Sequence, residues 1–196
     1  MDDLQALKDE LARFGADNDA VQTARGKRML NITPDTGQLL AVLVHATQAR
    51  QVLEVGTSNG YSTLWLAEAA AAIGGHVTTL EYAQDKADLA AANFARAGLQ
   101  ASITQVLGDA GRWLEDAADA SVDLLFLDSD RGAYLDWWPH LRRVLKPGGG
   151  LMVVDNATSH AQEMAGFMQA VRADAAFRCS EVPVGNGQFM AVRAAA

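Results

Sequence analysis

The feature that most constrains the fold is a glycine-rich turn between an apolar segment and a helical-looking segment. The stretch reads VLEVGTSNGYST over residues 52–63, with Gly56 and Gly60 four positions apart. A strand, a glycine-rich turn and a helix in this order open many nucleotide- and nucleoside-binding α/β units. Such turns also occur without ligands. Here all three parts appear in order, so we expect an α/β fold with a ligand at this turn.

Ser58 stands where a dinucleotide-binding turn has its second glycine. That glycine lets the backbone approach a diphosphate, and a Cβ at this position makes the approach harder. A ligand with adenosine but no diphosphate fits better, and S-adenosylmethionine is the obvious one. Ser58 and the acid Glu54 therefore argue against a nicotinamide-dependent oxidoreductase, which stays an alternative.

The rest of the chain alternates between strand and helix patterns. We expect strands at 51–56, 76–82, 102–107, 122–128 and 149–155, and helices at 60–73, 83–97, 110–118, 133–145 and 157–173. Gly185-Asn186, a hairpin turn signal, separates two further strands at 177–184 and 187–194. The pattern predicts a Rossmann-like, doubly wound α/β sheet of seven strands, mostly parallel, with a C-terminal antiparallel hairpin.

Extra helices precede this sheet. One apolar helical face is formed by Leu4, Leu7, Leu11 and Phe14. Gly15 is a plausible end for that helix, and Thr33-Pro34 has the pattern that starts a second helix over 34–49.

No repeat or change of composition divides the chain. We therefore expect residues 1–196 to form a single domain. Residues 1–50 would be an N-terminal helical cap, and residues 51–196 the cofactor-binding α/β core.

Charge and composition restrict the partners. The formal net charge of −8 disfavours nucleic-acid binding. The longest apolar stretch, 64–73, is interrupted by Glu68 and is too short to span a membrane. Cys179 is the only cysteine, which suits a reducing cytoplasm. We expect a cytoplasmic protein with a small-molecule substrate. The apolar N-terminal helix and Trp137-Trp138 favour a homodimer.

Acidic residues follow the second and third strands. Glu81 lies 21 residues after Gly60, close to the spacing of about 20 residues for an acid that binds ribose hydroxyls. It is followed by Tyr82, and the alternative is that Glu81 caps a helix or is simply solvated. Asp109, between Gly108 and Ala110, could accept a hydrogen bond from an adenine amino group or cap the next helix.

Acids also end the fourth and fifth strands, which are neighbours in a doubly wound sheet. Asp128, Asp155 and Asn156 would then converge on one crevice and offer three oxygen ligands suited to Mg²⁺. The alternative is that Asp155 and Asn156 only cap the following helix.

Together these residues resemble the class I S-adenosylmethionine-dependent methyltransferases, and more narrowly the O-methyltransferases related to the catechol and caffeoyl-CoA enzymes. The similarity runs from about Ile32 to Val192. It is most specific in VLEVGTSNGYSTLWLA (52–67), at the end of each of the four strands described above, and in Pro147-Gly148-Gly149. The resemblance implies methyl transfer to a hydroxyl of a small, aromatic molecule with help from a divalent metal such as Mg²⁺. A metal-independent methyltransferase acting on nitrogen, oxygen or a carboxylate is the main alternative, and a non-catalytic relative is another.

The resemblance also implies site residues. The expected metal ligands are Asp128, Asp155 and Asn156, and the expected catalytic residues are Asp128 and Arg131. The expected cofactor-binding residues are Asn31, Ile32, Glu54, Gly56, Thr57, Ser58, Gly60, Tyr61, Ser62, Glu81, Tyr82, Gly108, Asp109, Ala110 and Asp128.

Arg131 departs from the family pattern. The catechol enzymes carry a lysine as general base three residues after the first metal aspartate, and this chain has an arginine there. Arginine stays protonated and does not act as a neutral base. It could instead stabilise a substrate oxyanion or hold an acidic substrate group. The metal could itself lower the pKa of the substrate hydroxyl.

Overall fold

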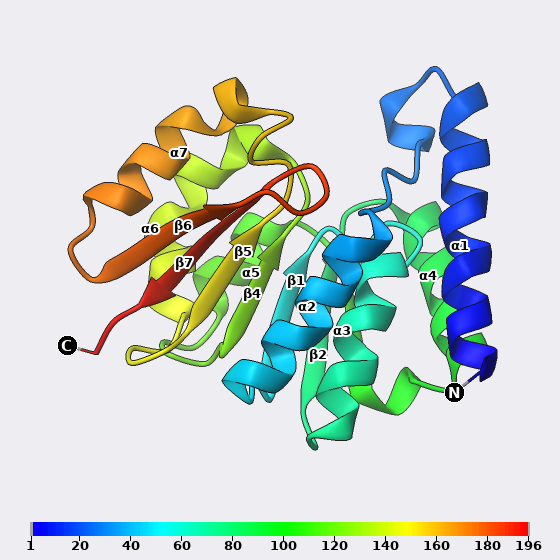
Figure 1. Ribbon diagram of the computed structural model, residues 1–196, viewed down its shortest axis with the longest axis horizontal. Coiled ribbons are helices and arrows are strands. Elements are labelled where there is room, and N and C mark those ends of the chain that lie inside the picture. The colour runs from blue at the N-terminus through cyan, green and yellow to red at the C-terminus, as the bar shows by residue number, and fades with distance from the viewer. Residues whose placement is uncertain (1, 196) are drawn as a thin grey trace.

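The computed structural model describes residues 2–195 and contains one seven-stranded sheet between two groups of helices (Figure 1). The strands are β1 (Gln51–Val55), β2 (His76–Glu81), β3 (Ile103–Leu107), β4 (Leu124–Leu127), β5 (Leu151–Val154), β6 (Phe177–Val182) and β7 (Gln188–Arg193). The α-helices are α1 (Asp2–Val21), α2 (Pro34–Thr47), α3 (Tyr61–Ala72), α4 (Gln84–Ala97), α5 (Ala110–Asp116), α6 (Tyr134–Val144) and α7 (Ala161–Ala173). Short 3₁₀ turns are η1 (Arg25–Lys27), η2 (Gln100–Ser102) and η3 (Arg131–Ala133).

The strand order is β3-β2-β1-β4-β5-β7-β6. Strands β1 to β5 run parallel, whereas β7 pairs antiparallel with both β5 and β6. This confirms the predicted doubly wound sheet with its closing hairpin. The order reverses direction between β1 and β4, and ligands of such sheets bind in the crevice beyond the strand ends at that point.

The central strands are buried on both faces. Val52 and Leu124 pack into a core with helices α1 to α4, whereas Leu53 and Leu125 pack into a second core with α5 to α7. Figure 1 shows these two helix groups on opposite sides of the sheet. Burial on both faces explains why these strands read as continuous apolar runs rather than as alternating patterns.

The predicted end of the first helix at Gly15 is wrong, because α1 continues to Val21. The glycine serves a close contact instead. A Cβ at Gly15 would lie 2.4 Å from the Asn31 side-chain nitrogen. That side chain donates a hydrogen bond to the Leu11 carbonyl (2.9 Å) and so ties the chain before α2 to α1.

The predicted start of the helix after β5 is also wrong. Helix α7 begins at Ala161 rather than at residue 157, because residues 155–160 form turns. Asn156 has a positive φ of 66° and does not cap the helix. Most other boundaries shift by three residues or fewer. Trp137 and Trp138 pack against the second core.

No helix among residues 2–195 combines the length and the apolar character needed to cross a membrane.

Candidate active site

A cavity of about 880 Å³ lies beyond the carboxyl ends of the parallel strands, at the reversal of strand order. Most of its lining comes from the glycine-rich turn after β1, the two segments that follow β4 and β5, and the connection between α1 and α2. Glu81, Lys86 and Asn186 also line it. The cavity therefore lies where the topology of the sheet predicts a ligand.

The glycine-rich turn passes very close to the end of β4. Gly56 has a φ of 107°, and a Cβ there would lie 2.1 Å from the Asp128 carbonyl oxygen. Ser58 also has a positive φ, of 48°. Only a residue without a side chain fits at Gly56. The glycine therefore allows the carboxyl ends of β1 and β4 to approach this closely.

Glu54 lies beneath this turn, outside the cavity lining, and is fully buried. Its carboxylate accepts hydrogen bonds from Ser62 Oγ (2.5 Å), Thr79 Oγ1 (2.6 Å) and the Thr63 hydroxyl. Burial raises the pKa of Glu54 to about 7, although these three hydrogen bonds act to lower it. The acid thus anchors the turn and the start of α3 from below.

Glu81 ties the end of β2 to the same turn. Its Oε2 accepts from the Ser58 N–H (2.8 Å), and its Oε1 accepts from the Tyr82 and Ala83 N–H groups (3.0 and 2.9 Å). Because Glu81 also lines the cavity, its carboxylate lies within reach of a ligand there. The two roles considered from the sequence, capping and ribose binding, are compatible in this position.

Residues 22–33, which we call the strap, form the connection between α1 and α2 and contribute to the cavity wall. Asp19 accepts hydrogen bonds from the N–H groups of Met29 (2.7 Å) and Leu30 (2.8 Å). Ser58 Oγ donates to the Met29 carbonyl (2.7 Å) and so joins the strap to the glycine-rich turn. Asn31 lines the cavity, and its side-chain oxygen is buried without a hydrogen-bond partner among residues 2–195.

The segments after β4 and β5 bring the two predicted aspartates together. Asn156 Nδ2 donates to Asp155 Oδ2 (2.8 Å) and to Asp128 Oδ1 (3.2 Å). Gln188 Nε2 donates to Asp155 Oδ1 from β7. Burial, followed by the nearby Asp155 and Glu54 carboxylates, raises the pKa of Asp128 well above its usual range. Burial also raises the pKa of Asp155.

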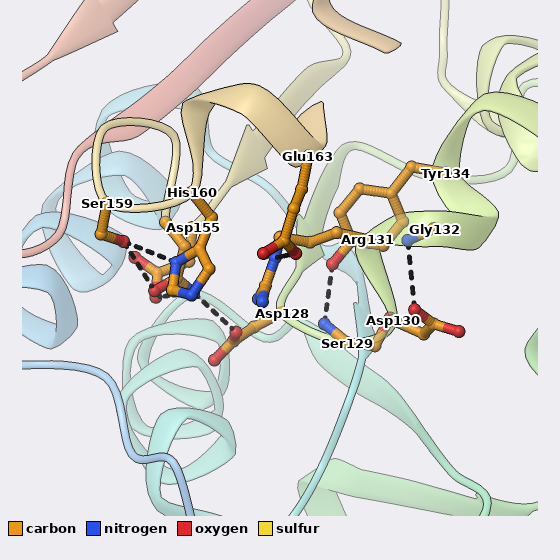
Figure 2. Close-up of polar contacts among 11 residues, drawn as sticks. Asp128, Ser129, Asp130, Arg131, Gly132, Tyr134, Asp155, Ser159, His160 and Glu163 are labelled. Carbon is orange, nitrogen blue, oxygen red and sulfur yellow. Dashed lines mark hydrogen bonds and ion pairs between the residues drawn. The ribbon is translucent and has the colours of Figure 1, made fainter. Parts of the chain in front are cut away.

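Arg131 lies next to these acids on η3. Its side chain is only 6% exposed, and its Nε donates to Glu163 Oε2 (2.9 Å) on α7. Figure 2 shows the guanidinium between Glu163 and Asp128. In the part of the chain that is described, no other acid lies within 4.0 Å of a nitrogen of this side chain.

The turn that carries Arg131 is held by Tyr134. Its hydroxyl accepts a hydrogen bond from the Ser129 N–H (2.7 Å), as Figure 2 shows. Burial, followed by the charge of Asp128, raises the pKa of the Tyr134 hydroxyl. This hydroxyl is therefore neutral at physiological pH and acts as a fixed acceptor for the backbone.

Many of the residues predicted from the sequence line the cavity, and some do not. Those that line it are Asn31, Ile32, Gly56, Thr57, Ser58, Tyr61, Ser62, Glu81, Asp128, Arg131, Asp155 and Asn156. Those outside its lining are Glu54, Gly60, Tyr82, Gly108, Asp109 and Ala110. Asp109 caps α5 by accepting from the Arg112 N–H (2.9 Å). Cofactor binding by either set stays a prediction.

Sequence reasoning missed several residues of the cavity region. Asp19 and Arg25 reach it from the N-terminal segment, and Glu163 from α7, whereas Gln188 acts on Asp155 from β7. None of them belongs to a recognisable motif. They reach the region through tertiary packing, which local sequence patterns do not describe.

The acids after β4 and β5 are chemically suited to a hard divalent cation, because two carboxylates and an amide supply oxygen donors. Among residues 2–195, no cluster of three or more His, Cys, Asp or Glu residues could hold a metal. A cation here would therefore need the Asn156 amide oxygen, whereas this amide now directs its nitrogen at both carboxylates. The donor set fits a metal only if that amide is reversed.

Comparison with known proteins places these features in context. A profile of the O-methyltransferase family matches residues 7–194. The chain is 38% identical over 149 residues to a catechol O-methyltransferase of Mycobacterium tuberculosis, covering 74% of this chain and 64% of that protein. It is 32% identical over 157 residues to a catechol O-methyltransferase of Niastella koreensis, covering 79% of this chain and 69% of that protein. The crystal structure of an O-methyltransferase from Bacillus cereus in complex with S-adenosylhomocysteine superposes with a TM-score of 0.79 at 25% identity, covering 96% of this chain and 90% of the other.

Proposed function

The chain belongs to the O-methyltransferase family, and from this premise we propose that it transfers a methyl group from S-adenosylmethionine to a hydroxyl of a small aromatic molecule. The M. tuberculosis relative is matched over slightly less than two thirds of its length. Catechols are the first substrates to test, because both relatives described above carry that name.

One observation carries this proposal. The glycine-rich turn and the acids after β4 and β5 line the same cavity, and the Gly56 contact with Asp128 fixes their separation. A cofactor over the turn and a hydroxyl beside the acids would then share one cavity. Holding two reactants in a fixed orientation supplies much of the rate of such a transfer.

The residues of the turn suit an adenosyl cofactor. The turn from Gly56 to Ser62 begins with small side chains, which leaves its backbone accessible to a ligand. Glu81 supplies a carboxylate for the ribose hydroxyls. The Asn31 side-chain oxygen has no hydrogen-bond partner among residues 2–195 and could accept one from the cofactor. S-adenosylmethionine, when bound, supplies an activated methyl group. The tasks of this chain are to bind the cofactor, align the hydroxyl and exclude water.

A divalent cation such as Mg²⁺ is part of the proposal. Asp128, Asp155 and the Asn156 oxygen would hold it, and it would lower the pKa of the substrate hydroxyl. Arg131 stays protonated, so it would add positive charge to the cavity without accepting the hydroxyl proton.

The direct experiment is a methyl-transfer assay with S-adenosylmethionine and catechol, followed by mass spectrometry of the product. We expect transfer that Mg²⁺ supports and that a chelator abolishes. Absence of product from a panel of phenols and catechols, with the cofactor bound, would count against the proposal.

One contact favours a second candidate, a metal-independent methyltransferase. The Asn156 amide nitrogen donates to both Asp128 and Asp155, so the two carboxylates already share a donor within the protein. In this version the two acids orient the substrate directly. Turnover that persists undiminished in chelator, with no dependence on added Mg²⁺, would favour this version over the first.

We also propose a cytoplasmic homodimer. The single cysteine suits a reducing compartment. Exposed apolar side chains on α1, Phe14 (43%) and Val21 (74%), offer a surface for self-association. Light scattering coupled to size-exclusion chromatography tests the dimer, and a monomeric mass would reject it.

A further inference from the structure

Arg131 is an unusual residue for this cavity, because its charge is buried and only partly paired. We propose that its guanidinium binds a carboxylate of the substrate, so that the preferred substrates are hydroxylated aromatic acids rather than neutral catechols. The inference rests on the proposed function, since it names the substrate class of the same site.

The first step is the environment of the side chain. Arg131 is 6% exposed, and the acid paired with it, Glu163, contacts it through Nε. No hydrogen bond joins its two terminal nitrogens to any residue between 2 and 195. Although Asp128 is three positions away, the two side chains form no ion pair within 4.0 Å. A buried cation therefore has an unused edge.

The second step is the shape of that edge. A guanidinium presents five N–H donors in a planar fork, and two parallel bonds from one edge match a carboxylate. Glu163 fixes the plane of the group through Nε, which leaves the two terminal nitrogens for a ligand. Because Arg131 lines the cavity and reaches between Glu163 and Asp128 (Figure 2), this edge is available to a molecule bound beside the acids.

The third step is a second cation in the same cavity. Arg25, on η1 of the strap, lines the same cavity, and its guanidinium makes no hydrogen bond or ion pair with residues 2–195. The pKa of Glu163 is lowered mainly by its hydrogen bond from Arg131, and Arg25 adds to the effect. Both cations thus line the cavity and act on Glu163 and Asp128, so they place positive charge beside the acids at one end of it.

The test compares three ligands on protein saturated with S-adenosylhomocysteine, by calorimetric titration without turnover. The ligands are 3,4-dihydroxybenzoate, the neutral isostere 3,4-dihydroxybenzamide, and catechol. We expect the wild-type protein to bind the benzoate about tenfold or more tightly than either neutral ligand, as charge-assisted hydrogen bonds allow. Equal affinities would overturn the inference without any variant.

Variants distinguish specific binding by the Arg131 guanidinium from a general effect of positive charge in the cavity. Arg131→Met should abolish the preference for the benzoate, and Arg131→Lys should restore only part of it, because a lysine lacks the planar fork. The matched control is Lys86→Met, which removes one positive charge from another wall of the same cavity. The control should keep the preference. A preference lost equally in the control would overturn the assignment to Arg131.

Two further outcomes distinguish this inference from the proposed function. If Arg131→Met weakens the binding of S-adenosylhomocysteine tenfold, the residue serves the cofactor and the inference fails. If all three ligands are methylated with equal kcat/KM, the proposed function stands and the inference fails. If the benzoate preference depends on Arg131 but no ligand is methylated, the anion site stands and the proposed function fails.

Discussion

The two sides of the cavity satisfy their buried charges in different ways. On the side of the glycine-rich turn, Glu54 and Glu81 accept three hydrogen bonds each. On the side of β4 and β5, the donors to Asp128 and Asp155 are side-chain amides, and Arg131 keeps a free edge. The acids of the first side are therefore fully paired without a ligand, whereas Arg131 on the second side is only partly paired among the described residues.

This difference suggests how one cavity can combine cofactor binding, which is the same in every turnover, with discrimination between substrates. A pre-formed turn whose supporting acids are already hydrogen-bonded costs little to organise when a cofactor binds. Unsatisfied charges, by contrast, gain most from a partner of the right chemistry, so they discriminate between ligands. We therefore expect changes at the turn to affect stability and cofactor affinity, and changes at β4 and β5 to affect the substrate step.

The largest expected effect comes from a substitution at Gly56, where the two sides of the cavity meet. Gly56→Ala places a Cβ against the Asp128 carbonyl in a left-handed conformation, and should cost about 4 kcal/mol of unfolding free energy from overpacking and strain. Binding of S-adenosylhomocysteine should be lost as well. Urea denaturation and calorimetry measure the two effects.

Gly74→Ala is the matched control, because Gly74 also has a positive φ, of 69°, but nothing lies within 4 Å of the added Cβ. It should cost only about 1 kcal/mol. Equal losses in the two variants would show that backbone strain, and not the close approach of the two strand ends, explains Gly56.

The next effect concerns the buried acid below the turn. Burial raises the pKa of Glu54 from 4.5 to about 7, so the folded protein keeps this proton where the unfolded chain has lost it. Its contribution is fully present below about pH 4.5 and is lost as the pH rises through about 7. The unfolding free energy of the wild type minus that of Glu54→Gln should therefore fall by about 3 kcal/mol over this window.

Denaturant titrations between pH 4.5 and 8 measure this difference. The exposed acid Glu10 provides a control, because Glu10→Gln should produce no such fall. A difference between wild type and Glu54→Gln that stays flat with pH would mean that Glu54 is ionised throughout, and that its three donors outweigh the cost of burial.

A smaller effect isolates the side of β4. Tyr134→Phe removes the acceptor for the Ser129 N–H and should lower the unfolding free energy by about 1–2 kcal/mol. Turnover should fall because the Arg131 turn loosens, whereas the affinity for S-adenosylhomocysteine should stay within about twofold. Loss of cofactor affinity in this variant would contradict the separation of the two sides.

The smallest effect isolates the link between the turn and the strap. Ser58→Ala removes the hydrogen bond to the Met29 carbonyl and should weaken S-adenosylhomocysteine binding by about 1 kcal/mol, or fivefold. Ser121→Ala, which removes an exposed local hydrogen bond to the Ala118 carbonyl, is the control and should leave the affinity unchanged. Unchanged affinity in Ser58→Ala would mean that the strap does not contribute to cofactor binding.

The same contrast explains what could be predicted from the sequence. The turn was predictable because its strand, glycines and helix are contiguous, so local rules describe it. Asp128 and Asp155 were predictable because parallel strands end at one edge of a sheet, which brings strand-end residues together.

The residues that reach this region by tertiary packing were not predictable. Glu163 lies on α7, which begins four residues later than the sequence pattern predicts. Gln188 donates a hydrogen bond to Asp155 from the antiparallel hairpin. The predicted helix end at Gly15 was wrong for a related reason. A glycine selected for close packing against Asn31 reads, in sequence alone, like a helix end.

The most direct test of the account measures cofactor affinity and methyl transfer in parallel on Asp155→Ala. The account predicts that the dissociation constant for S-adenosylhomocysteine stays within about twofold of the wild type, because the hydrogen bonds that Glu54 and Glu81 accept at the turn do not involve Asp155. It predicts that turnover falls at least about 100-fold, as expected when a group acting on the reacting oxygen is removed. Full activity, or the joint loss of cofactor binding and turnover in a folded protein, would contradict it.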